Sequence, residues 1–301
     1  MQIAFFSAHS YDIEALERAA KEGDVTLQHH LAFITSRLDV QSAKLAEGSE
    51  AMCIFVNDVA DEATLRVLHA VGTKVLLLRC SGYDIVNLQA AKELEMPVLR
   101  APAYSPYAVA DHTEALMLTL KRKIHCSCNR TRELNFRLEG LLGFDINGKT
   151  VGVVGTGKID ALFARIATGF GCKVLAYDIK ESPDAMIFGA EYVSQGEVCA
   201  LSDITSLHCP LLASTKHVIN AESIAKMKHG VMLINTSRGG LIDTKALVSG
   251  LKRGKIGSVG LNVFEGEGRP VLLLGSVGGG IIADETIVRL FTFPNVVITG
   301  H

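Results

Sequence analysis

The segment between residues 151 and 178, VGVVGTGKIDALFARIATGFGCKVLAYD, constrains the fold of this chain more than any other. An apolar run leads into Gly155-Thr156-Gly157, and an amphipathic stretch with helical spacing follows. A second apolar run then ends at Asp178. A strand, a glycine turn, a helix and a second strand form a βαβ unit, from which parallel sheets are built. We therefore expect at least one α/β domain.

The same alternation of short apolar runs and amphipathic stretches continues along the whole chain. Apolar strands joined by helices predict doubly wound parallel sheets, whose strands are buried on both faces. In the first third, strands are predicted at 3–6, 52–56, 74–79 and 97–100, with helices at 11–21, 61–70 and 86–95. In the remainder, strands are predicted at 151–155, 173–177, 204–208, 231–235, 258–263 and 296–299.

The pattern breaks at Pro102 and Pro106, and a long helix is predicted to begin near Ser105. A chain of 301 residues is long enough for two domains. We expect one domain over residues 1–101 and a second over residues 102–301. The predicted fold class is thus α/β, with two doubly wound parallel-sheet domains.

The composition argues against several classes of protein. A net charge of −2 gives no electrostatic case for binding nucleic acid or an anionic membrane. The first residues, MQIAFFSAHSYD, do not resemble a secretion signal, and the apolar stretch from Pro270 to Ala283 is too short to cross a bilayer. Seven irregularly spaced cysteines suit the cytoplasm. Cys126 and Cys128 have poor zinc-binding spacing, so no metal site is predicted.

The glycine turn has the sequence context of a dinucleotide-binding site. Gly155 and Gly157 let the backbone approach a pyrophosphate, and the following helix N-terminus supplies amide donors. Asp178 lies about 20 residues further on, where an acid would bind the ribose hydroxyls and repel a 2′-phosphate. We therefore predict NAD as the cofactor, in preference to NADP. A plain structural turn without a ligand is the alternative.

Asp160 stands where the dinucleotide fingerprint has its third glycine. Its carboxylate is expected to repel the pyrophosphate by about 2 kcal/mol, and Lys158 is expected to offset part of this repulsion. On that basis, Asp160→Gly should tighten the binding of NADH.

Polar residues follow three predicted strands of the second domain. Arg238 comes after VMLIN, Glu267 after VGLNV, and His301 ends the run NVVITGH. Because the carboxyl ends of parallel strands meet at one edge of a sheet, these side chains form a set that can reduce a 2-keto acid. The guanidinium would hold a carboxylate, the imidazole would donate a proton, and the acid would keep the imidazole protonated. Each could instead be an ordinary surface residue.

With these residues in place, the chain resembles the D-specific 2-hydroxyacid dehydrogenases, most closely the bacterial fermentative D-lactate dehydrogenases. The most specific matching stretches are LEGLLGFDINGKTVGVVGTGKI, DITSLHCPL, MLINTSRGGLIDTKAL and FPNVVITGH. The resemblance implies a flavodoxin-like substrate domain followed by a Rossmann NAD-binding domain. It also implies that Arg238, Glu267 and His301 are the catalytic arginine, acid and histidine.

The resemblance further implies the residues that line the ligands. A small 2-keto acid or 2-hydroxy acid, with pyruvate first, would lie in a cleft that closes on NADH. Its substrate-binding residues would be Ser81, Gly82, Tyr104 and Arg238. The cofactor-binding residues would be Gly155, Thr156, Gly157, Lys158, Ile159, Asp178, His208, Cys209, Pro210, Thr236, Ser237 and Asn262. We also expect the protein to be a homo-oligomer.

Several positions depart from the family pattern and keep alternatives open. Asn262 stands where the family has an aspartate, and residues 268–285 are apolar and glycine-rich where relatives are acidic and aromatic. The family has a helix after the histidine that returns to the first domain, so we expect that domain to lack it here. The alternatives are another 2-keto acid, such as glyoxylate or hydroxypyruvate, and a non-enzymatic or degenerate NAD-binding homologue.

Overall fold

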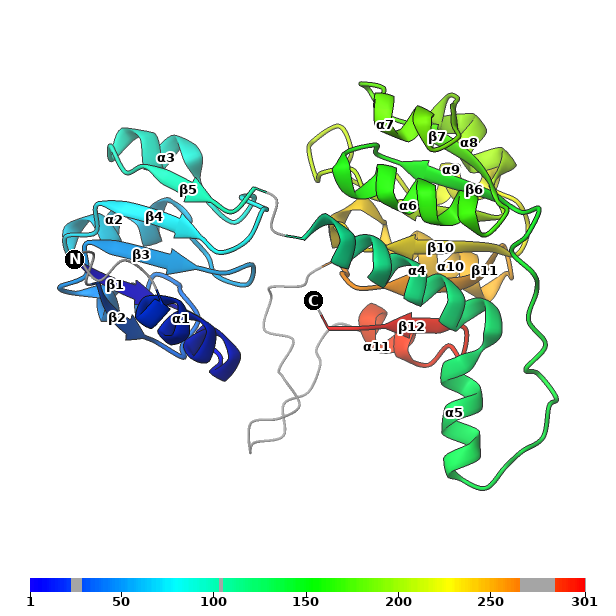
Figure 1. The fold of residues 1–301 in the computed structure, drawn as a ribbon, viewed down its shortest axis with the longest axis horizontal. Coiled ribbons are helices and arrows are strands. Elements are labelled where there is room, and N and C mark those ends of the chain that lie inside the picture. The colour runs from blue at the N-terminus through cyan, green and yellow to red at the C-terminus, as the bar shows by residue number, and fades with distance from the viewer. Residues whose placement is uncertain (23–28, 103–104, 266–284, 301) are drawn as a thin grey trace. The chain divides into compact units, whose positions relative to one another are not determined.

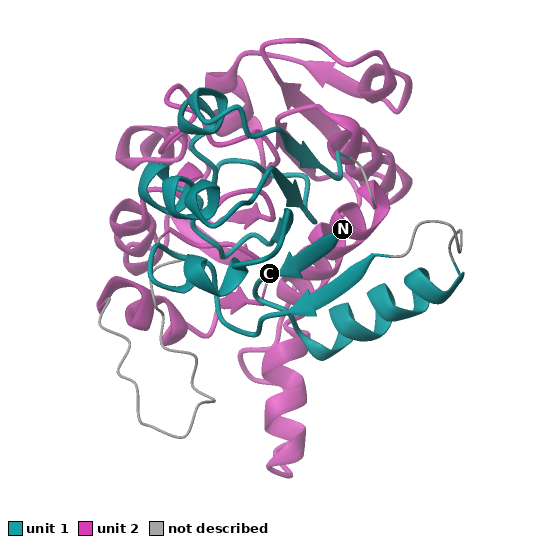
Figure 2. Ribbon diagram, turned by 90° about the vertical axis from the view of Figure 1, so that its left-hand side faces the viewer, with its two compact units in different colours: residues 1–104 teal, residues 105–301 magenta. Residues whose placement is uncertain are grey.

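A computed structural model describes residues 1–22, 29–102, 105–265 and 285–300 of the chain. The chain divides into two compact units, Met1–Tyr104 (unit 1) and Ser105–His301 (unit 2), which are coloured separately in Figure 2. The sequence placed the boundary at residue 101. The division follows residue 104 because the long helix α4 (Pro106–Arg122) packs against the strands and helices of unit 2.

Unit 1 contains a five-stranded parallel sheet with the strand order β2-β1-β3-β4-β5. This is the flavodoxin-like order, as expected. The strands are β1 (Gln2–Phe5), β2 (His30–Phe33), β3 (Ala51–Ile54), β4 (Val75–Leu78) and β5 (Val98–Arg100). The helices are α1 (Ser10–Glu22), η1 (Ser42–Ala46), α2 (Glu62–Ala70) and α3 (Leu88–Glu93).

Unit 2 contains a seven-stranded parallel sheet with the order β12-β11-β10-β9-β6-β7-β8 (Figure 1). Counted within the unit, this is the Rossmann order 3-2-1-4-5-6 with one further strand. The strands are β6 (Thr150–Val154), β7 (Lys173–Tyr177), β8 (Ala190–Tyr192), β9 (Ile204–Leu207), β10 (Val231–Asn235), β11 (Ile256–Leu261) and β12 (Val296–Ile298). The remaining helices are α5 (Ile124–Arg132), α6 (Lys158–Gly169), α7 (Pro183–Ile187), α8 (Gln195–Leu201), α9 (Ala221–Lys226), η2 (Gly239–Leu241), α10 (Thr244–Lys252) and α11 (Glu285–Phe291).

The predicted α/β fold with two doubly wound sheets is confirmed, although β2 and β8 were not predicted. Both are edge strands in which buried residues are few: β2 has none, and β8 has only Ala190. An edge strand buries less apolar surface than a central one, so its sequence carries a weaker burial signal.

The sheet of unit 2 has a hydrophobic core on each face. Alternate residues of β10 divide between the two cores, with Leu233 on one side and Met232 and Ile234 on the other. Helices α8, α9, α10 and α11 contribute to the first core, and α4, α6 and α7 contribute to the second. Burial on both faces explains the uninterrupted apolar runs of the sequence.

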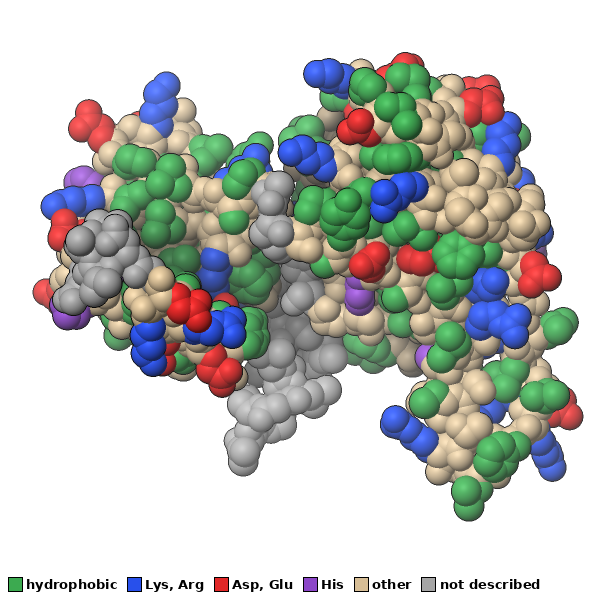
Figure 3. Space-filling model, in the orientation of Figure 1, with side chains coloured by type: hydrophobic (Ala, Val, Ile, Leu, Met, Phe, Trp, Pro, Cys, Tyr) green, Lys and Arg blue, Asp and Glu red, His purple; other side chains and the backbone are tan. Residues whose placement is uncertain are grey.

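Helix α4 ends at Lys123, whose left-handed backbone (φ 49°) redirects the chain. The following α5 has no buried residue and projects from unit 2 (Figure 1). We refer to residues 124–145 as the arm. Its largest apolar side chains are mostly exposed, as Figure 3 shows at the projecting end: Leu134 (83%), Phe136 (72%), Leu138 (80%) and Leu142 (89%).

Neither membrane-spanning helices nor metal-binding clusters occur in the part of the chain that the structure describes. None of its helices is long and apolar enough to cross a bilayer. No three His, Cys, Asp or Glu residues in it gather as metal ligands. The Cys126 thiol instead donates to the carbonyl oxygen of Pro294, 3.3 Å away.

Gly155 is required by a close approach between two turns. It has a φ of +101°, and a Cβ atom there would lie 2.5 Å from the amide nitrogen of Cys209. Gly148 also has a positive φ, +75°, but no atom lies within 4 Å of its Cβ position. The two glycines therefore share the backbone constraint and differ in the steric one.

Alanine at these two positions separates the constraints. Gly148→Ala is expected to lower the free energy of unfolding by about 1 kcal/mol, the cost of a left-handed backbone. Gly155→Ala should lower it by about 2–4 kcal/mol, because overpacking against the backbone of Cys209 adds to the same strain. Urea unfolding followed by circular dichroism measures both. Equal losses would show that the turn moves away from Cys209 without cost.

Candidate dinucleotide and substrate site

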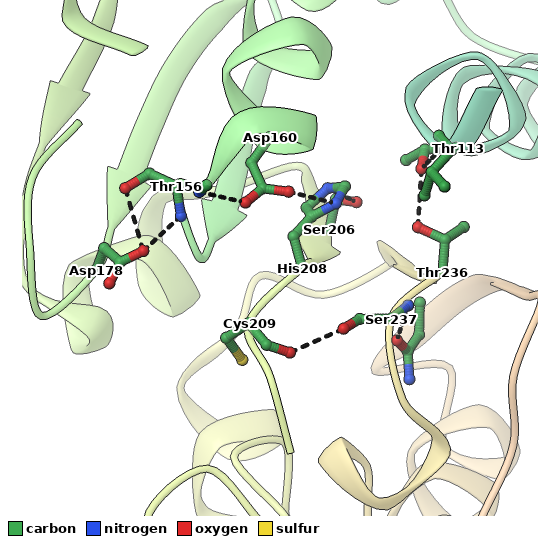
Figure 4. Close-up of polar contacts among 12 residues, drawn as sticks. Thr113, Thr156, Asp160, Asp178, Ser206, His208, Cys209, Thr236 and Ser237 are labelled. Atoms are coloured by element: carbon green, nitrogen blue, oxygen red, sulfur yellow. Dashed lines mark hydrogen bonds and ion pairs between the residues drawn. The ribbon is translucent and has the colours of Figure 1, made fainter. Parts of the chain in front are cut away.

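The carboxyl ends of β6 and β9 meet where the strand order of unit 2 reverses. The amides of His208 and Cys209, after β9, both donate to the carbonyl oxygen of Val154 at the end of β6, at 2.8 and 3.1 Å. In open α/β sheets, ligands bind at this reversal, outside the carboxyl ends of the strands. The glycine turn and the segment after β9 thus form the two walls of the candidate site (Figure 4).

The glycine turn has the geometry of a pyrophosphate cradle. The amide of Gly155 donates to Tyr177 at 2.8 Å, and Gly157 is the N-cap of α6. Lys158 and Ile159 occupy the first turn of α6, where amides have no acceptor within the helix. Such amides, together with the positive end of the helix dipole, bind phosphate groups. The residues present therefore fit a dinucleotide.

Asp178 lies at the end of β7, beside this turn. One carboxylate oxygen, Oδ2, accepts hydrogen bonds from the amide and hydroxyl of Thr156 at 2.6 and 3.2 Å. The other, Oδ1, accepts from the amide of Lys180 at 3.3 Å. These contacts, which the sequence did not reveal, hold the acid at the rim of the cradle.

The structure corrects the expectation for Asp160. Its side chain is 5% exposed, and its Oδ2 accepts a hydrogen bond from the amide of Gly157 at 2.6 Å. Its Oδ1 lies 3.0 Å from Nδ1 of His208. From the sequence, Lys158 was the one group expected to offset the charge of Asp160. That account was wrong because the partner, His208, follows a different strand and comes close only in the folded sheet.

The residues that follow β9, His208 to Pro210, contact several neighbouring groups. The Nε2 atom of His208 lies 2.8 Å from Oγ of the buried Ser206, and its ring lies 5.3 Å from the ring of Phe163 on α6. Burial raises the pKa of the Cys209 thiol to about 11, so the thiol is neutral at physiological pH. Pro210 follows, and its carbonyl oxygen accepts from the hydroxyl of Thr215.

The segment after β10 joins the same edge of the sheet. The Ser237 hydroxyl donates to the carbonyl oxygen of Cys209 at 2.8 Å, which ties the ends of β10 and β9 together. The Thr236 hydroxyl lies 2.8 Å from that of Thr113 on α4. Next to them, Arg238 is half-buried, and its Nη1 donates to the carbonyl oxygen of Ser237 at 2.8 Å. Arg238 therefore follows the residue that ties the end of β10 to the segment after β9.

Asn262 connects the ends of β11 and β12. Its amide nitrogen donates to the Thr299 hydroxyl at 3.1 Å and to the carbonyl oxygen of Gly300 at 2.7 Å. The Nε2 atom of His112 lies 2.9 Å from the same Thr299 hydroxyl. An aspartate could not donate these bonds, so the amide suits this position. His112, Thr113 and Thr299 were missed, because their partners are distant in the sequence and nothing local marks them.

A second carboxylate–histidine pair follows β11. Oε1 of Glu265 lies 2.7 Å from Nε2 of His217, and its Oε2 accepts from the hydroxyl and amide of Thr244. Burial opposes ionisation of Glu265, but these hydrogen bonds outweigh it and lower the pKa of its carboxyl. Gly239 lets the backbone of Phe264 come close, since a Cβ atom at Gly239 would lie 2.0 Å from the carbonyl oxygen of Phe264.

The remaining predicted residues fall into two groups. In unit 1, Ser81 and Gly82 follow the carboxyl end of β4, where the guanidinium of Arg100 donates to the carbonyl oxygen of Ser81. Tyr104, Glu267 and His301 lie outside the described residues. Within the described part, the structure brings Arg238 and the predicted cofactor residues of five neighbouring strand ends to one edge of the sheet.

Comparisons with known proteins show the family of the chain. The family model for the D-isomer specific 2-hydroxyacid dehydrogenase, NAD binding domain, matches residues 114–301. The chain is 46% identical over its full length to 2-hydroxyacid dehydrogenase homolog 1 of Schizosaccharomyces pombe, and covers 89% of that protein. It is 44% identical to D-lactate dehydrogenase of Escherichia coli, again over its full length and over 90% of that protein.

Solved structures agree in fold as well as in sequence. The apo-structure of the Escherichia coli enzyme matches all of this chain and 89% of its own, with a TM-score of 0.87. The pyruvate reductase of Chlamydomonas reinhardtii is 41% identical, with a TM-score of 0.89 over 99% of this chain and 88% of its own. The chain therefore belongs to the D-isomer specific 2-hydroxyacid dehydrogenases, as an NAD-dependent, D-lactate dehydrogenase-like oxidoreductase.

Proposed function

We propose that this protein reduces pyruvate to D-lactate with NADH. The observation that carries the proposal is the position of Arg238, whose neighbour Ser237 is hydrogen-bonded to the wall of the dinucleotide cradle. A cation that can hold a carboxylate thus stands beside the place for the cofactor. Relatives named D-lactate dehydrogenase and pyruvate reductase support pyruvate over a larger 2-keto acid.

In this proposal, the cofactor pyrophosphate lies against the turn from Gly155 to Ile159, and Asp178 accepts hydrogen bonds from the ribose hydroxyls. The segments His208–Pro210 and Thr236–Ser237, with Asn262, line the rest of the cofactor. NADH supplies the hydride for the carbonyl carbon. The protein positions the cofactor beside the substrate and excludes competing reactions.

The substrate would be held by its two oxygen-bearing groups. Arg238 binds the carboxylate through its planar fork, with Ser81, Gly82 and Tyr104 contributing from unit 1. His301, the third residue after the end of β12, donates a proton to the carbonyl oxygen as the carbon gains hydride. Glu267 keeps that imidazole protonated. Hydride and proton together convert the keto acid into the hydroxy acid.

The observations that favoured a non-enzymatic homologue are weaker in the folded protein. Asp160 contacts the Gly157 amide and His208, and Asn262 donates a hydrogen bond to the carbonyl oxygen of Gly300 that an aspartate could not make. We also propose a cytoplasmic location. Its support is that none of the seven cysteines forms a disulfide.

The fork of Arg238 is tested by a substitution that keeps its charge. Arg238→Lys should lower kcat/KM for pyruvate by about 10²-fold or more, because a single ammonium cannot make two parallel hydrogen bonds to a carboxylate. The KM for NADH should change little. Steady-state assays of NADH oxidation measure both constants.

Arg253→Lys is the matched control, since Arg253 is an exposed residue that ends α10. It should leave both constants at their original values. Full activity towards pyruvate in Arg238→Lys would exclude Arg238 as the keto-acid ligand.

Asp178 is expected to select the cofactor. NADH should be preferred over NADPH by at least about tenfold in kcat/KM. A repulsion of about 1.4 kcal/mol between the carboxylate of Asp178 and the 2′-phosphate of NADPH is enough for a tenfold difference. Asp178→Asn removes the charge and should narrow that preference, whereas Asp184→Asn, on the neighbouring α7, should not. An unchanged preference in Asp178→Asn would contradict this role.

We further propose that two copies of the chain associate through the arm. Its exposed apolar side chains form a surface of the kind that marks protein contacts. Charges of both signs flank them, Arg132 and Arg137 beside Glu133 and Glu139, so an identical arm offers opposite charges in a two-fold pairing.

The association is tested at the apolar centre of the arm. Replacing Phe136 and Leu138 together by serine should shift the protein from dimer to monomer in light scattering at micromolar concentration. The control is Leu201→Ser, at an exposed leucine that ends α8, and it should leave the protein a dimer. A monomeric unsubstituted protein would refute the proposal.

A further inference from the structure

In the proposed function, unit 1 contributes Ser81 and Gly82 to the binding of the keto acid. Both lie in the segment that follows β4, and we refer to residues 80–83 as the keto-acid loop. Strand β5 pairs with β4 in parallel, and the register makes Arg100 the partner of Leu78 at the ends of the two strands (Figure 1). Arg100 therefore lies beside the point at which the chain enters the loop.

The side chain of Arg100 contacts the keto-acid loop at two residues. Its Nη1 atom donates to the carbonyl oxygen of Ser81, and its Cζ atom lies 5.1 Å from the centroid of the Tyr83 ring. These contacts stand on either side of Gly82. The thiol of the buried Cys80 donates to the carbonyl oxygen of Gly82 at 3.3 Å. Two successive carbonyl groups of the loop are thus held by side chains.

The contact with the Ser81 carbonyl fixes the direction of an amide. In a planar trans peptide, the C=O group of one residue and the N–H group of the next point in opposite directions. The guanidinium that holds the carbonyl oxygen of Ser81 therefore turns the amide of Gly82 away from Arg100. Among the described residues, the amides of Ser81 and Gly82 donate to no acceptor, and both residues are partly exposed. Both amides can thus donate to an oxygen atom of a ligand.

The glycine makes the loop depend on these contacts. Gly82 has no Cβ atom, so its backbone has more conformational freedom than that of other residues. A donor that moves must be ordered each time a ligand binds, whereas a donor that is already held in place avoids this cost. Because Arg100 anchors the residues on both sides of Gly82, it limits this freedom before the substrate binds.

Resting on the proposed reduction of a 2-keto acid, we infer that Arg100 is a positioning residue for the substrate carboxylate. It acts through the keto-acid loop, where it holds the carbonyl of Ser81 and the ring of Tyr83. The Gly82 amide is thereby kept in the direction from which it donates to the carboxylate. Arg100 contacts neither the cofactor nor the reacting carbonyl in this arrangement, so its loss weakens substrate binding and leaves turnover nearly unchanged.

The neighbouring Arg79 has a different role. Its guanidinium donates to the carbonyl oxygens of Phe6 and Ser7, at 3.0 and 2.8 Å, and so joins the ends of β4 and β1. It also lies 3.4 Å from the carboxylate of Asp12. Arg100 is exposed, and within the described part of the chain its side chain makes no hydrogen bond outside the loop. Removing the side chain of Arg100 should therefore change the loop and leave the fold of unit 1 intact.

The test is steady-state reduction of pyruvate and of hydroxypyruvate by the full chain with NADH. Arg100→Ala should raise the KM for pyruvate about tenfold, which corresponds to about 1.4 kcal/mol. Both kcat and the KM for NADH should change by less than about twofold, since uniform binding of the substrate is what is lost. The KM for hydroxypyruvate should rise by a similar factor, because both substrates present the same carboxylate. Arg100→Lys should recover part of the loss, because an ammonium can still donate to the carbonyl oxygen of Ser81.

Arg66→Ala is the matched control. Arg66 is an exposed arginine of unit 1 whose guanidinium contacts Glu62 at 2.7 Å, within α2, and its loss should change none of these constants. Tyr83→Ala removes the second contact of Arg100 with the loop and should also raise the KM for pyruvate. In the double variant, the two factors should not multiply, because residues that act through one contact are not additive. Unfolding in urea identifies a variant that fails to fold, and Arg100→Met, which keeps the bulk of the side chain, then replaces Arg100→Ala.

The possible outcomes separate this role of Arg100 from the proposed function. An unchanged KM for pyruvate in Arg100→Ala, or a fall in kcat with KM unchanged, would overturn the role of Arg100 while the proposed reaction stands. Factors that multiply in the double variant would also contradict it. If the unsubstituted protein reduces hydroxypyruvate or glyoxylate but not pyruvate, only the proposed substrate falls, and the same KM comparison is made with the keto acid that is reduced. If it reduces none of the three, the proposed function and the role of Arg100 fall together.

Discussion

The contact between the ends of β6 and β9 is the constraint on which the rest of the site depends. The amides of His208 and Cys209 both donate to the carbonyl oxygen of Val154. A side chain at position 155 would overlap the backbone of Cys209, so this position requires glycine. This contact places the glycine turn opposite His208 and Cys209, where the strand order reverses. A ligand at that reversal is bound by two walls that the backbone itself holds in place.

Side chains extend this arrangement along the edge of the sheet. Ser237 joins the end of β10 to that of β9, and Asn262 joins the end of β11 to the residues after β12. Helix α4 contributes from the side through Thr113 and His112. Because most of these groups are partly or fully buried, each hydrogen bond also avoids the cost of an unsatisfied polar atom. These hydrogen bonds thus connect the ends of neighbouring strands along one edge of the sheet.

The local sequence was sufficient to predict the strands and helices that carry a clear apolar pattern. The central strands β6 and β10 consist mainly of apolar residues, and α4 begins with a serine N-cap followed by proline. Of the four edge strands, β5 and β12 were predicted from their apolar residues, whereas β2, which begins with His30, and β8, which contains Glu191, were missed. Asp178 and Arg238 could be proposed from the sequence because they are the first and the third residue after the ends of β7 and β10, and the carboxyl ends of parallel strands share one edge.

The sequence by itself determined the α/β class, the dinucleotide turn, the family and the set of candidate residues, since each is written in a short stretch of chain. Only the tertiary structure decided what Asp160 does. In the sequence it is an acid in the place of a glycine, with a lysine two residues away. In the folded protein its partners are Gly157 and the buried His208. The physical reason is that the free energy of a buried charge depends on the groups around it, and the sheet brings those groups from distant strands.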